Sequence, residues 1–330
     1  MIHTAKFQVL LQGDEIGLLC RKFKEKITLM GNVIDQNFNG ISTSFKKLFS
    51  LWRMDVYVDF IKLIGKADLQ EKDIKEIQKS LEEYLYFVFG KNDKELTLLR
   101  IDFRFDAVIP NKKHRDFLLK IYKKTVEKYG FKKKNDHYKS TIYFNSKSVK
   151  VLIYDKEIER EKKGEKIQDY EKDVLRFEVS LQNRHLNYMK RTYGLDKRLE
   201  NYLTDEFWTK YMTKNICPIF FKGDYFPISA SEKIIKMSNI KESDKTKLRE
   251  FMCDVSRYGF DRLKDLKLNR NGREKEKYSK YKIDKFTKVL EDLNINPIPI
   301  PKHDAEQLGK EKWIRNPLSN QIYKALDEVL

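Results

Sequence analysis

Residues 99–106 read LRIDFRFD, in which apolar and charged side chains alternate. Alternation with a period of two is typical of a β-strand, because successive side chains point to opposite faces of a sheet. The pattern predicts a strand over 96–108, which Pro110 ends. Asp102 then lies at the centre of its charged face, and Ile101 and Phe103 lie on the apolar face.

Two later segments have the same character. SVKVLIYDKEIE at 148–159 and VLRFEVSL at 174–181 predict strands over 149–155 and 174–182. Each carries a chemically capable side chain, Tyr154 in the first and Glu178 in the second. Charges inside such strands are costly unless they are paired, solvated or metal-bound. We therefore expect Asp102, Tyr154 and Glu178 to meet on one sheet.

The segments between these strands complete a β-α-β-β-(α)-β order. Apolar residues spaced three and four apart predict helices over 69–89, ended by Gly90, and 111–129, ended by Gly130. A further strand is predicted at 140–145, and a hairpin turn joins it to 149–155. The expected fold is α+β, with an RRM-like (ferredoxin-like) antiparallel sheet core.

The two ends of the chain differ from this core. Residues 1–63 are predicted to form a β-rich extension, with strand-like runs FQVLL, KITLM, GISTSF and VYVDFIKLI. From about residue 196 the pattern is helical and basic. Helices are expected over 198–212, 232–267, 282–293 and 320–330, with an exposed basic loop over 264–282. We therefore predict an α+β domain over 1–195 and a helical domain over 196–330.

The charge balance indicates the class of partner. The chain has 68 Lys and Arg against 50 Asp and Glu, a net charge of +18, and 40% of its residues are hydrophobic. A folded domain this basic favours a polyanion such as nucleic acid, although a Lys-rich composition that only aids solubility is the alternative. Three widely spaced cysteines exclude a disulfide framework. Without a signal peptide or an apolar run of about 18 residues, we expect an intracellular protein with no membrane partner.

Asp102 and Glu178 are the candidate metal ligands. Two carboxylates, with waters and a substrate phosphate, form an oxygen site suited to Mg²⁺ or Mn²⁺. Ion pairs with neighbouring arginines on a solvated sheet face would explain the same residues without a metal. The histidines form no H-x-H or H-E-x-x-H motif, and no G-x-x-x-x-G-K-[ST] loop is present.

Tyr154 is the candidate nucleophile. A phenol has a pKa of about 10, so it attacks efficiently only where a cation or a base stabilises the phenolate. Lys156 or a bound metal could supply that positive charge. The alternative is an edge-strand tyrosine that packs its ring and leaves its hydroxyl in water.

In their order and spacing these segments resemble the gene II/X replication initiators of filamentous phages and plasmids, which are related to Rep_trans rolling-circle initiators. The resemblance covers about 98–212. It rests on Arg100-Ile101-Asp102 with Pro110, on Y-x-K-x-x-E at 154–159, and on Arg176-Phe177-Glu178. Arg184 and the Gly-Leu pair at 194–195 follow the family pattern as well, whereas Asp106 lies outside it.

The resemblance implies a rolling-circle initiator that nicks and rejoins DNA. In that family the tyrosine attacks one strand at the origin and becomes linked to its 5′-phosphate, and the released 3′-OH primes replication. Tyr154 would inherit this role by position, with Lys156 beside it and 1–195 as the nicking domain. The metal roles of Asp102 and Glu178 are inferred from their carboxylate chemistry and not from the resemblance. The expected DNA-binding residues are Arg100, Arg104, Lys150, Arg176 and Arg184.

Partners and alternatives follow from this hypothesis. The expected partners are single-stranded or melted origin DNA and a host helicase in the cytoplasm of a bacterial cell. The basic 196–330 part would help to bind the origin duplex. A conjugative or mobilisation relaxase shares the same chemistry, whereas a non-enzymatic basic DNA-binding protein would bind DNA without cutting it.

Overall fold

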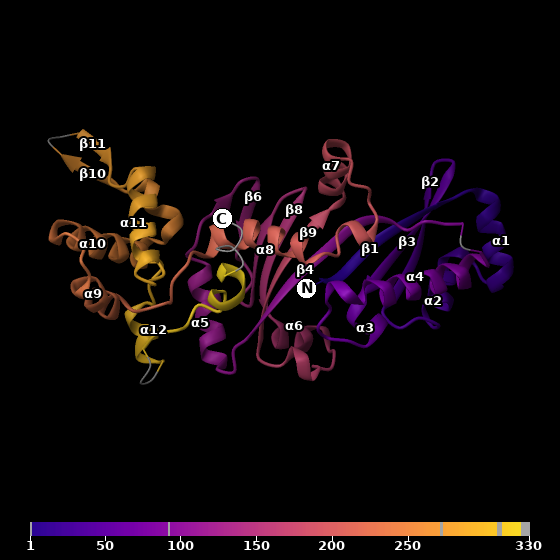
Figure 1. The fold of residues 1–330 in the computed structure, drawn as a ribbon, viewed down its shortest axis with the longest axis horizontal. Coiled ribbons are helices and arrows are strands. Elements are labelled where there is room, and N and C mark those ends of the chain that lie inside the picture. The colour runs from indigo at the N-terminus through magenta and orange to yellow at the C-terminus, as the bar shows by residue number, and fades with distance from the viewer. Residues whose placement is uncertain (1, 92, 271–272, 309–311, 325–330) are drawn as a thin grey trace. The chain divides into compact units, whose positions relative to one another are not determined.

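A computed structural model of the chain describes residues 2–91, 93–270, 273–308 and 312–324 (Figure 1). The chain forms two compact units. The first comprises 1–105, 146–150 and 178–212, and the second comprises 106–145, 151–177 and 213–330. The predicted central strands contribute residues to both units: β4 (Thr97–Val108), β8 (Val149–Asp155) and β9 (Val174–Gln182).

The first unit is built on antiparallel strands. β1 (Ile2–Leu11) pairs with β3 (Leu51–Asp59) on one side and with β4 on the other, and β2 (Ile41–Leu48) pairs with β3. Its helical segments are α1 (Gly13–Phe23), α2 (Ile27–Asp35), α3 (Phe60–Ile64), η1 (Glu71–Asp73), α4 (Ile74–Phe89), α7 (Asn183–Tyr193), η3 (Leu199–Asn201) and the start of α8 (Asp205–Phe220).

Helix α4 lies within the predicted range 69–89. Its buried residues recur at spacings of three and four, which gives one apolar face. On that face the Tyr84 hydroxyl lies 2.9 Å from the Thr43 hydroxyl of β2. The helix ends as predicted at Gly90, whose φ of 74° is the left-handed conformation that glycine adopts without steric cost.

The β-rich prediction for residues 1–63 is wrong at two of its runs. The run KITLM lies mostly in helix α2 and not in a strand. In this helix Gly31 packs so closely against the Thr43 carbonyl that a Cβ atom would clash with it. VYVDFIKLI divides at Asp59, where β3 ends and the Asp59 side chain accepts a hydrogen bond from the Lys62 amide to cap α3. Apolar runs this short do not distinguish a strand from a buried helix.

The second unit mixes a short meander with helices. Its strands are β5 (Lys128–Tyr129), β6 (Lys132–Asn135), β7 (Thr141–Asn145) and the hairpin β10 (Lys267–Arg270) and β11 (Arg273–Glu276). Its helical segments are α5 (Lys112–Tyr122), α6 (Lys156–Lys163), η2 (Asp169–Glu171), the end of α8, α9 (Ile228–Met237), α10 (Glu242–Tyr258), η4 (Phe260–Asp265), α11 (Lys280–Asp292), α12 (Lys302–Glu306) and η5 (Ser319–Tyr323).

Several predicted boundaries in this unit are wrong. Helix α5 ends at Tyr122 rather than near 129, because the Thr125 hydroxyl turns to the Ile219 carbonyl and the chain then forms β5. The range expected as a helix over 232–267 contains three separate helical segments, α9, α10 and η4. The loop expected over 264–282 contains the β10–β11 hairpin and the start of α11. Of the helix expected over 320–330, residues 325–330 lie outside the described part.

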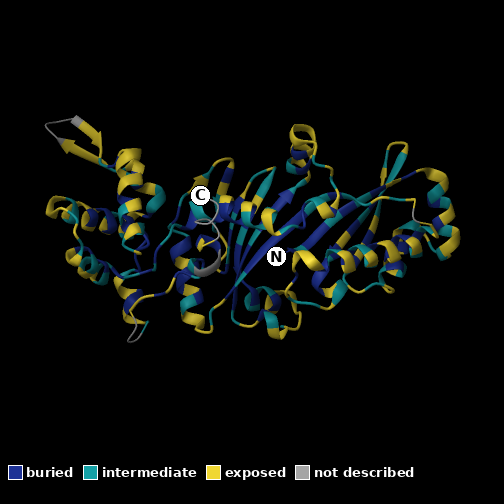
Figure 2. Ribbon diagram, in the orientation of Figure 1, coloured by how far each residue is buried: buried dark blue, intermediate teal, exposed yellow. Residues whose placement is uncertain are grey.

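The α+β class is confirmed. Strands near 96–108, 140–145, 149–155 and 174–182 are all present, and the large sheet has the hydrogen-bonded order β2-β3-β1-β4-β9-β8-β7-β6-β5. The RRM-like arrangement and the 195/196 boundary stay predictions. Strands β1, β4 and β9 are largely buried, whereas the helices have exposed outer faces (Figure 2).

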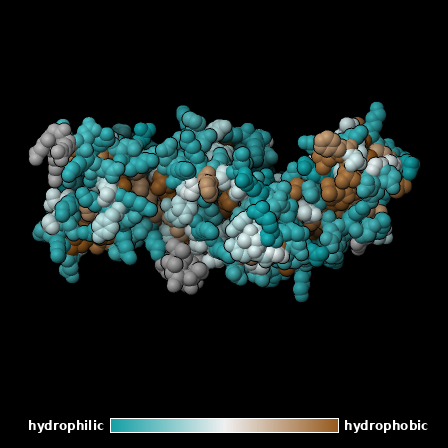
Figure 3. Space-filling view, turned by 90° about the horizontal axis from the view of Figure 1, so that it is seen from above, coloured by the Kyte–Doolittle hydropathy of each residue, from teal (hydrophilic) through white to brown (hydrophobic). Residues whose placement is uncertain are grey.

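The surface agrees with the polar composition. Most of the face seen in Figure 3 is hydrophilic, with smaller hydrophobic patches between. Among the described residues, no helix is long and apolar enough to span a membrane.

Candidate functional site

Asp102 is a buried carboxylate at the centre of β4. The hydroxyls of Thr4, directly opposite on β1, and of Ser180 on β9 donate to its two oxygens. The Arg100 guanidinium lies 3.0 Å from Oδ2. Burial raises the pKa of the Asp102 carboxyl above its usual range, Arg100 opposes that shift, and the negative charge of Glu178 adds to it. Asp102 and Glu178 are therefore neighbours that interact electrostatically.

A histidine joins this pair of carboxylates. The Nδ1 atom of His3 lies 3.3 Å from Oε1 of Glu178. The β1–β4 register explains how His3 reaches it: Ile2 pairs with Phe103 and Thr4 pairs with Asp102, so His3 is an extra residue on β1. Such a β-bulge redirects a side chain, and bulges are common beside active sites. We call Asp102, Glu178 and His3 the carboxylate cluster.

The carboxylate cluster offers oxygen and imidazole donors. Two interacting carboxylates repel each other, and a divalent cation between them would relieve that repulsion. Because hydroxyl groups rotate easily, the hydrogen bonds from Thr4 and Ser180 leave Asp102 able to contact a bound cation as well. Among the described residues, no three His, Cys, Asp or Glu side chains are arranged to hold a metal. The donor types suit Mg²⁺ or Mn²⁺ only if substrate and water oxygens complete the coordination.

Tyr154 lies near the end of β8 in the second unit. Only 7% of its surface is exposed, so its ring is packed rather than free in solvent. The Lys156 ammonium lies 5.8 Å from the centroid of that ring. A cation in this position favours electron-rich aromatic and phenolate groups.

Lys156 is buried, and its charge is balanced by acidic partners. Its Nζ donates to Oε2 of Glu159 at 2.6 Å and lies 3.6 Å from Oε1 of Glu171. Burial and then the nearby charge of Arg176 lower the pKa of Lys156, while Glu159 opposes that change. The Y-x-K-x-x-E spacing therefore has a local structural cause, since its lysine and glutamate pair across the first turn of α6.

Arg115 anchors the turn that follows Tyr154. This buried guanidinium donates to Asp155 at 2.8 Å and to Asp173 at 2.7 Å, and it also pairs with Glu157. Asp155 in turn accepts a hydrogen bond from the Ile158 amide and so caps α6. The backbone on the C-terminal side of the tyrosine is therefore fixed at several points.

The residues expected to contact DNA differ in exposure. Lys150 and Arg184 are exposed, and Arg100 is half-buried over the Tyr57 ring. Arg104 is buried and donates to the Ala67 carbonyl. Arg176 is fully buried and pairs with Asp106. Their part in DNA binding stays a prediction, and for the two buried arginines the described contacts are within the protein.

Sequence reasoning missed His3 and Arg115. No sequence motif contains His3, because its position depends on a bulge between strands almost a hundred residues apart. Arg115 reads as one of several basic residues on an amphipathic helix, and only the fold brings carboxylates from 155, 157 and 173 to it. A basic and aromatic helix at 183–193 was also not predicted; α7 occupies this range.

One family model matches part of the chain. No curated protein matches the chain. Residues 62–200 match the model of a family described as the N-terminal part of the gene II replication-associated protein, and this range includes the strands that carry Asp102, Tyr154 and Glu178. The predicted resemblance is thus confirmed over that range, where the chain is similar to the N-terminal part of gene II replication-associated proteins.

Proposed function

We propose that this protein initiates rolling-circle DNA replication by nicking, and later rejoining, one strand of origin DNA. The match of residues 62–200 to a replication-associated family carries the proposal. The net charge of +18 on this chain suits a nucleic acid substrate. In this proposal Tyr154 is the nucleophile, and the buried Lys156 supplies positive charge beside its ring.

The proposed step is a transesterification. The phenolate oxygen of Tyr154 forms a bond to phosphorus, and the bond from phosphorus to the 3′ oxygen breaks. The leaving oxygen takes a proton and becomes the free 3′-OH that primes synthesis, while the phenol proton passes to solvent. Attack of a 3′-OH on the phosphotyrosine reverses the step and rejoins the strand. No external energy source is needed, because one phosphodiester replaces another.

Asp102 and Glu178 are the residues that we propose to hold Mg²⁺ or Mn²⁺. When bound, such a cation polarises the scissile phosphate and offsets the charge that develops on it. The hydroxyls of Thr4 and Ser180 would keep Asp102 oriented, and His3 would orient Glu178. We also propose that these carboxylates converge with Tyr154 on an RRM-like sheet within a 1–195 domain.

The partners in this proposal are single-stranded or melted origin DNA and a host helicase in the bacterial cytoplasm. The basic helical part over 196–330 would bind the adjoining duplex. A relaxase would show the same chemistry, and the DNA site that it cuts would distinguish the two.

Incubation with supercoiled plasmid carrying the origin, with and without Mg²⁺, tests the proposal. We expect an open circle with covalently bound protein only when the metal is present. Equal nicking in the presence of a chelator would contradict the metal-dependent mechanism. Salt-sensitive binding without cleavage under either condition would instead support a non-enzymatic DNA-binding protein.

A further inference from the structure

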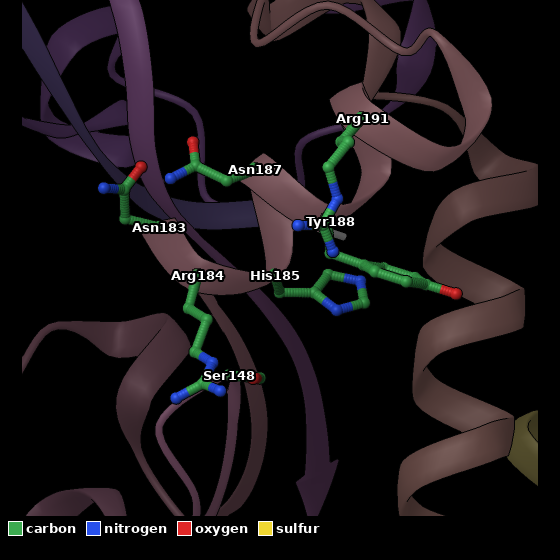
Figure 4. Close-up of a pocket in the computed structure, with 7 residues that line it drawn as sticks. All are labelled: Ser148, Asn183, Arg184, His185, Asn187, Tyr188 and Arg191. Carbon is green, nitrogen blue, oxygen red and sulfur yellow. The ribbon is translucent and has the colours of Figure 1, made fainter.

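Helix α7 carries an open pocket within the first unit. Leu186 and Met189 bury one face of the helix, and Gly194 ends it in the left-handed conformation. Residues of its exposed side and Ser148 of the β7–β8 turn line a hollow of 610 Å³ (Figure 4). A hydrogen bond of 2.9 Å from the Gln182 amide to the Ser148 carbonyl ties the turn to the start of the helix.

The pocket is lined by arginines that no described carboxylate neutralises. Arg184 and Arg191 both line it, and no carboxylate of the described residues forms an ion pair with either. The buried arginines behave differently: Arg115 and Arg176 are both held by aspartates. Uncompensated guanidinium groups beside a hollow favour an anionic ligand, above all phosphate.

Asparagine side chains add further donors to the same pocket. The Lys197 ammonium donates to Oδ1 of Asn183 at 2.8 Å and to Oδ1 of Asn187 at 3.0 Å. Because the carbonyl ends of both amides are taken, their NH₂ groups remain to bind a ligand. The pocket therefore presents mainly hydrogen-bond donors, as an anion site requires.

Exposed tyrosines give the same helix flat apolar surfaces. Tyr188 lines the pocket and is 43% exposed, and Tyr193, one to two turns along, is 64% exposed. Their rings meet edge to face at 5.9 Å. Arg184, Tyr188 and Arg191 are spaced four and three apart and so share one helical face. His185 also lines the pocket, and its Nε2 atom lies 2.6 Å from the Tyr211 hydroxyl.

From these observations we infer that the α7 pocket binds a short single-stranded stretch of nucleic acid. The phosphates of the nucleic acid contact Arg184 and Arg191, and one of its bases stacks on Tyr188. Stacking needs a base whose face is free, which an intact duplex does not offer, and alternating phosphate and base contacts are typical of single-strand sites. The inference deepens the proposed function, since it assigns a location for holding the strand outside the nucleophile and the carboxylate cluster.

Two neighbouring residues of α7 allow a matched test. Arg191→Gln removes a charge that lines the pocket, whereas Lys190→Gln removes one from an exposed residue that pairs with Asp196 and does not line it. The probe is a fluorescein-labelled oligothymidylate of about 16 nucleotides, whose affinity is measured by anisotropy at several salt concentrations.

We expect Arg191→Gln to weaken binding about ten-fold and to reduce the salt slope by about one, with little change for Lys190→Gln. Tyr188→Ala should also weaken binding about ten-fold, while Tyr188→Phe should retain it. Equal losses for Arg191→Gln and Lys190→Gln, or full affinity in Tyr188→Ala, would overturn the inference. A loss of affinity in Arg191→Gln that appears only with a duplex probe would also overturn the inference.

The same variants separate this inference from the proposed function. If wild-type protein forms the covalent adduct with origin DNA but the α7 variants bind like wild type, the inference fails and the nicking mechanism stands. If the α7 variants lose binding as expected but wild-type protein forms no adduct, the pocket stands and the nicking mechanism fails.

Discussion

The Arg176 guanidinium and the Asp106 carboxylate form a two-point ion pair, with Nε 2.6 Å from Oδ1 and Nη2 2.8 Å from Oδ2. Arg176 is fully buried, so this pair neutralises a charge inside the protein. It accounts for Asp106, which lies outside the family pattern, by giving it a structural partner.

Breaking this pair should destabilise the protein strongly. Asp106→Ala would leave the Arg176 charge buried without its carboxylate, and we expect the free energy of unfolding to fall by about 3–5 kcal/mol. Urea denaturation measures the change. The double variant Asp106→Leu, Arg176→Met should recover part of the loss, since it removes both charges. A single variant as stable as wild type would contradict this role.

Arg115 should speed covalent adduct formation by anchoring the backbone beside Tyr154. Its guanidinium joins Asp155, Glu157 and Asp173, and a lysine cannot reproduce this fork of donors. We expect Arg115→Lys to slow covalent adduct formation with origin DNA while leaving oligonucleotide affinity within about two-fold, because it does not remove a surface charge. Faster hydrogen exchange in α6 should accompany the change. An unchanged adduct rate would show that this anchoring is not needed.

Through Lys132, the free energy of unfolding depends on pH in the alkaline range. Burial, followed by the charge of Lys214, lowers the pKa of Lys132 to about 8, below the value of about 10.4 expected for the unfolded chain. Between these values the unfolded state binds more protons than the folded state, so this residue makes stability rise with pH.

The check compares wild type with Lys132→Met in urea at pH 7 and pH 10. The difference in unfolding free energy between the two proteins should shift in favour of wild type at the higher pH. A difference that stays constant would show that Lys132 titrates alike in both states.

Local patterns predicted the central elements well. Alternation in LRIDFRFD and the runs at 149–155 and 174–182 identified β4, β8 and β9, because strands with apolar faces repeat every second residue. Gly90 marked the end of α4 for an equally local reason. Short apolar runs near the N-terminus failed, since KITLM fits a helix as well as a strand.

The site was only partly predictable. The strands that carry Asp102, Tyr154 and Glu178 followed from local patterns, whereas the roles of these three residues stay predictions. The His3 bulge and the Arg115 network depend on contacts between distant segments, which no local period encodes. Helix α7 follows β9 directly, and its buried Leu186 and Met189 are too few to stand out in a basic, tyrosine-rich sequence.

Covalent adduct formation tests the central claim most directly. Wild-type protein, Tyr154→Phe and the matched variant Tyr143→Phe, altered on neighbouring strand β7, are incubated with Mg²⁺ and labelled single-stranded origin DNA. Denaturing gels then separate free from protein-linked DNA. We predict an adduct with wild type and Tyr143→Phe, and none with Tyr154→Phe, which should still bind the DNA. An undiminished adduct in Tyr154→Phe would contradict the assignment of Tyr154 as the nucleophile.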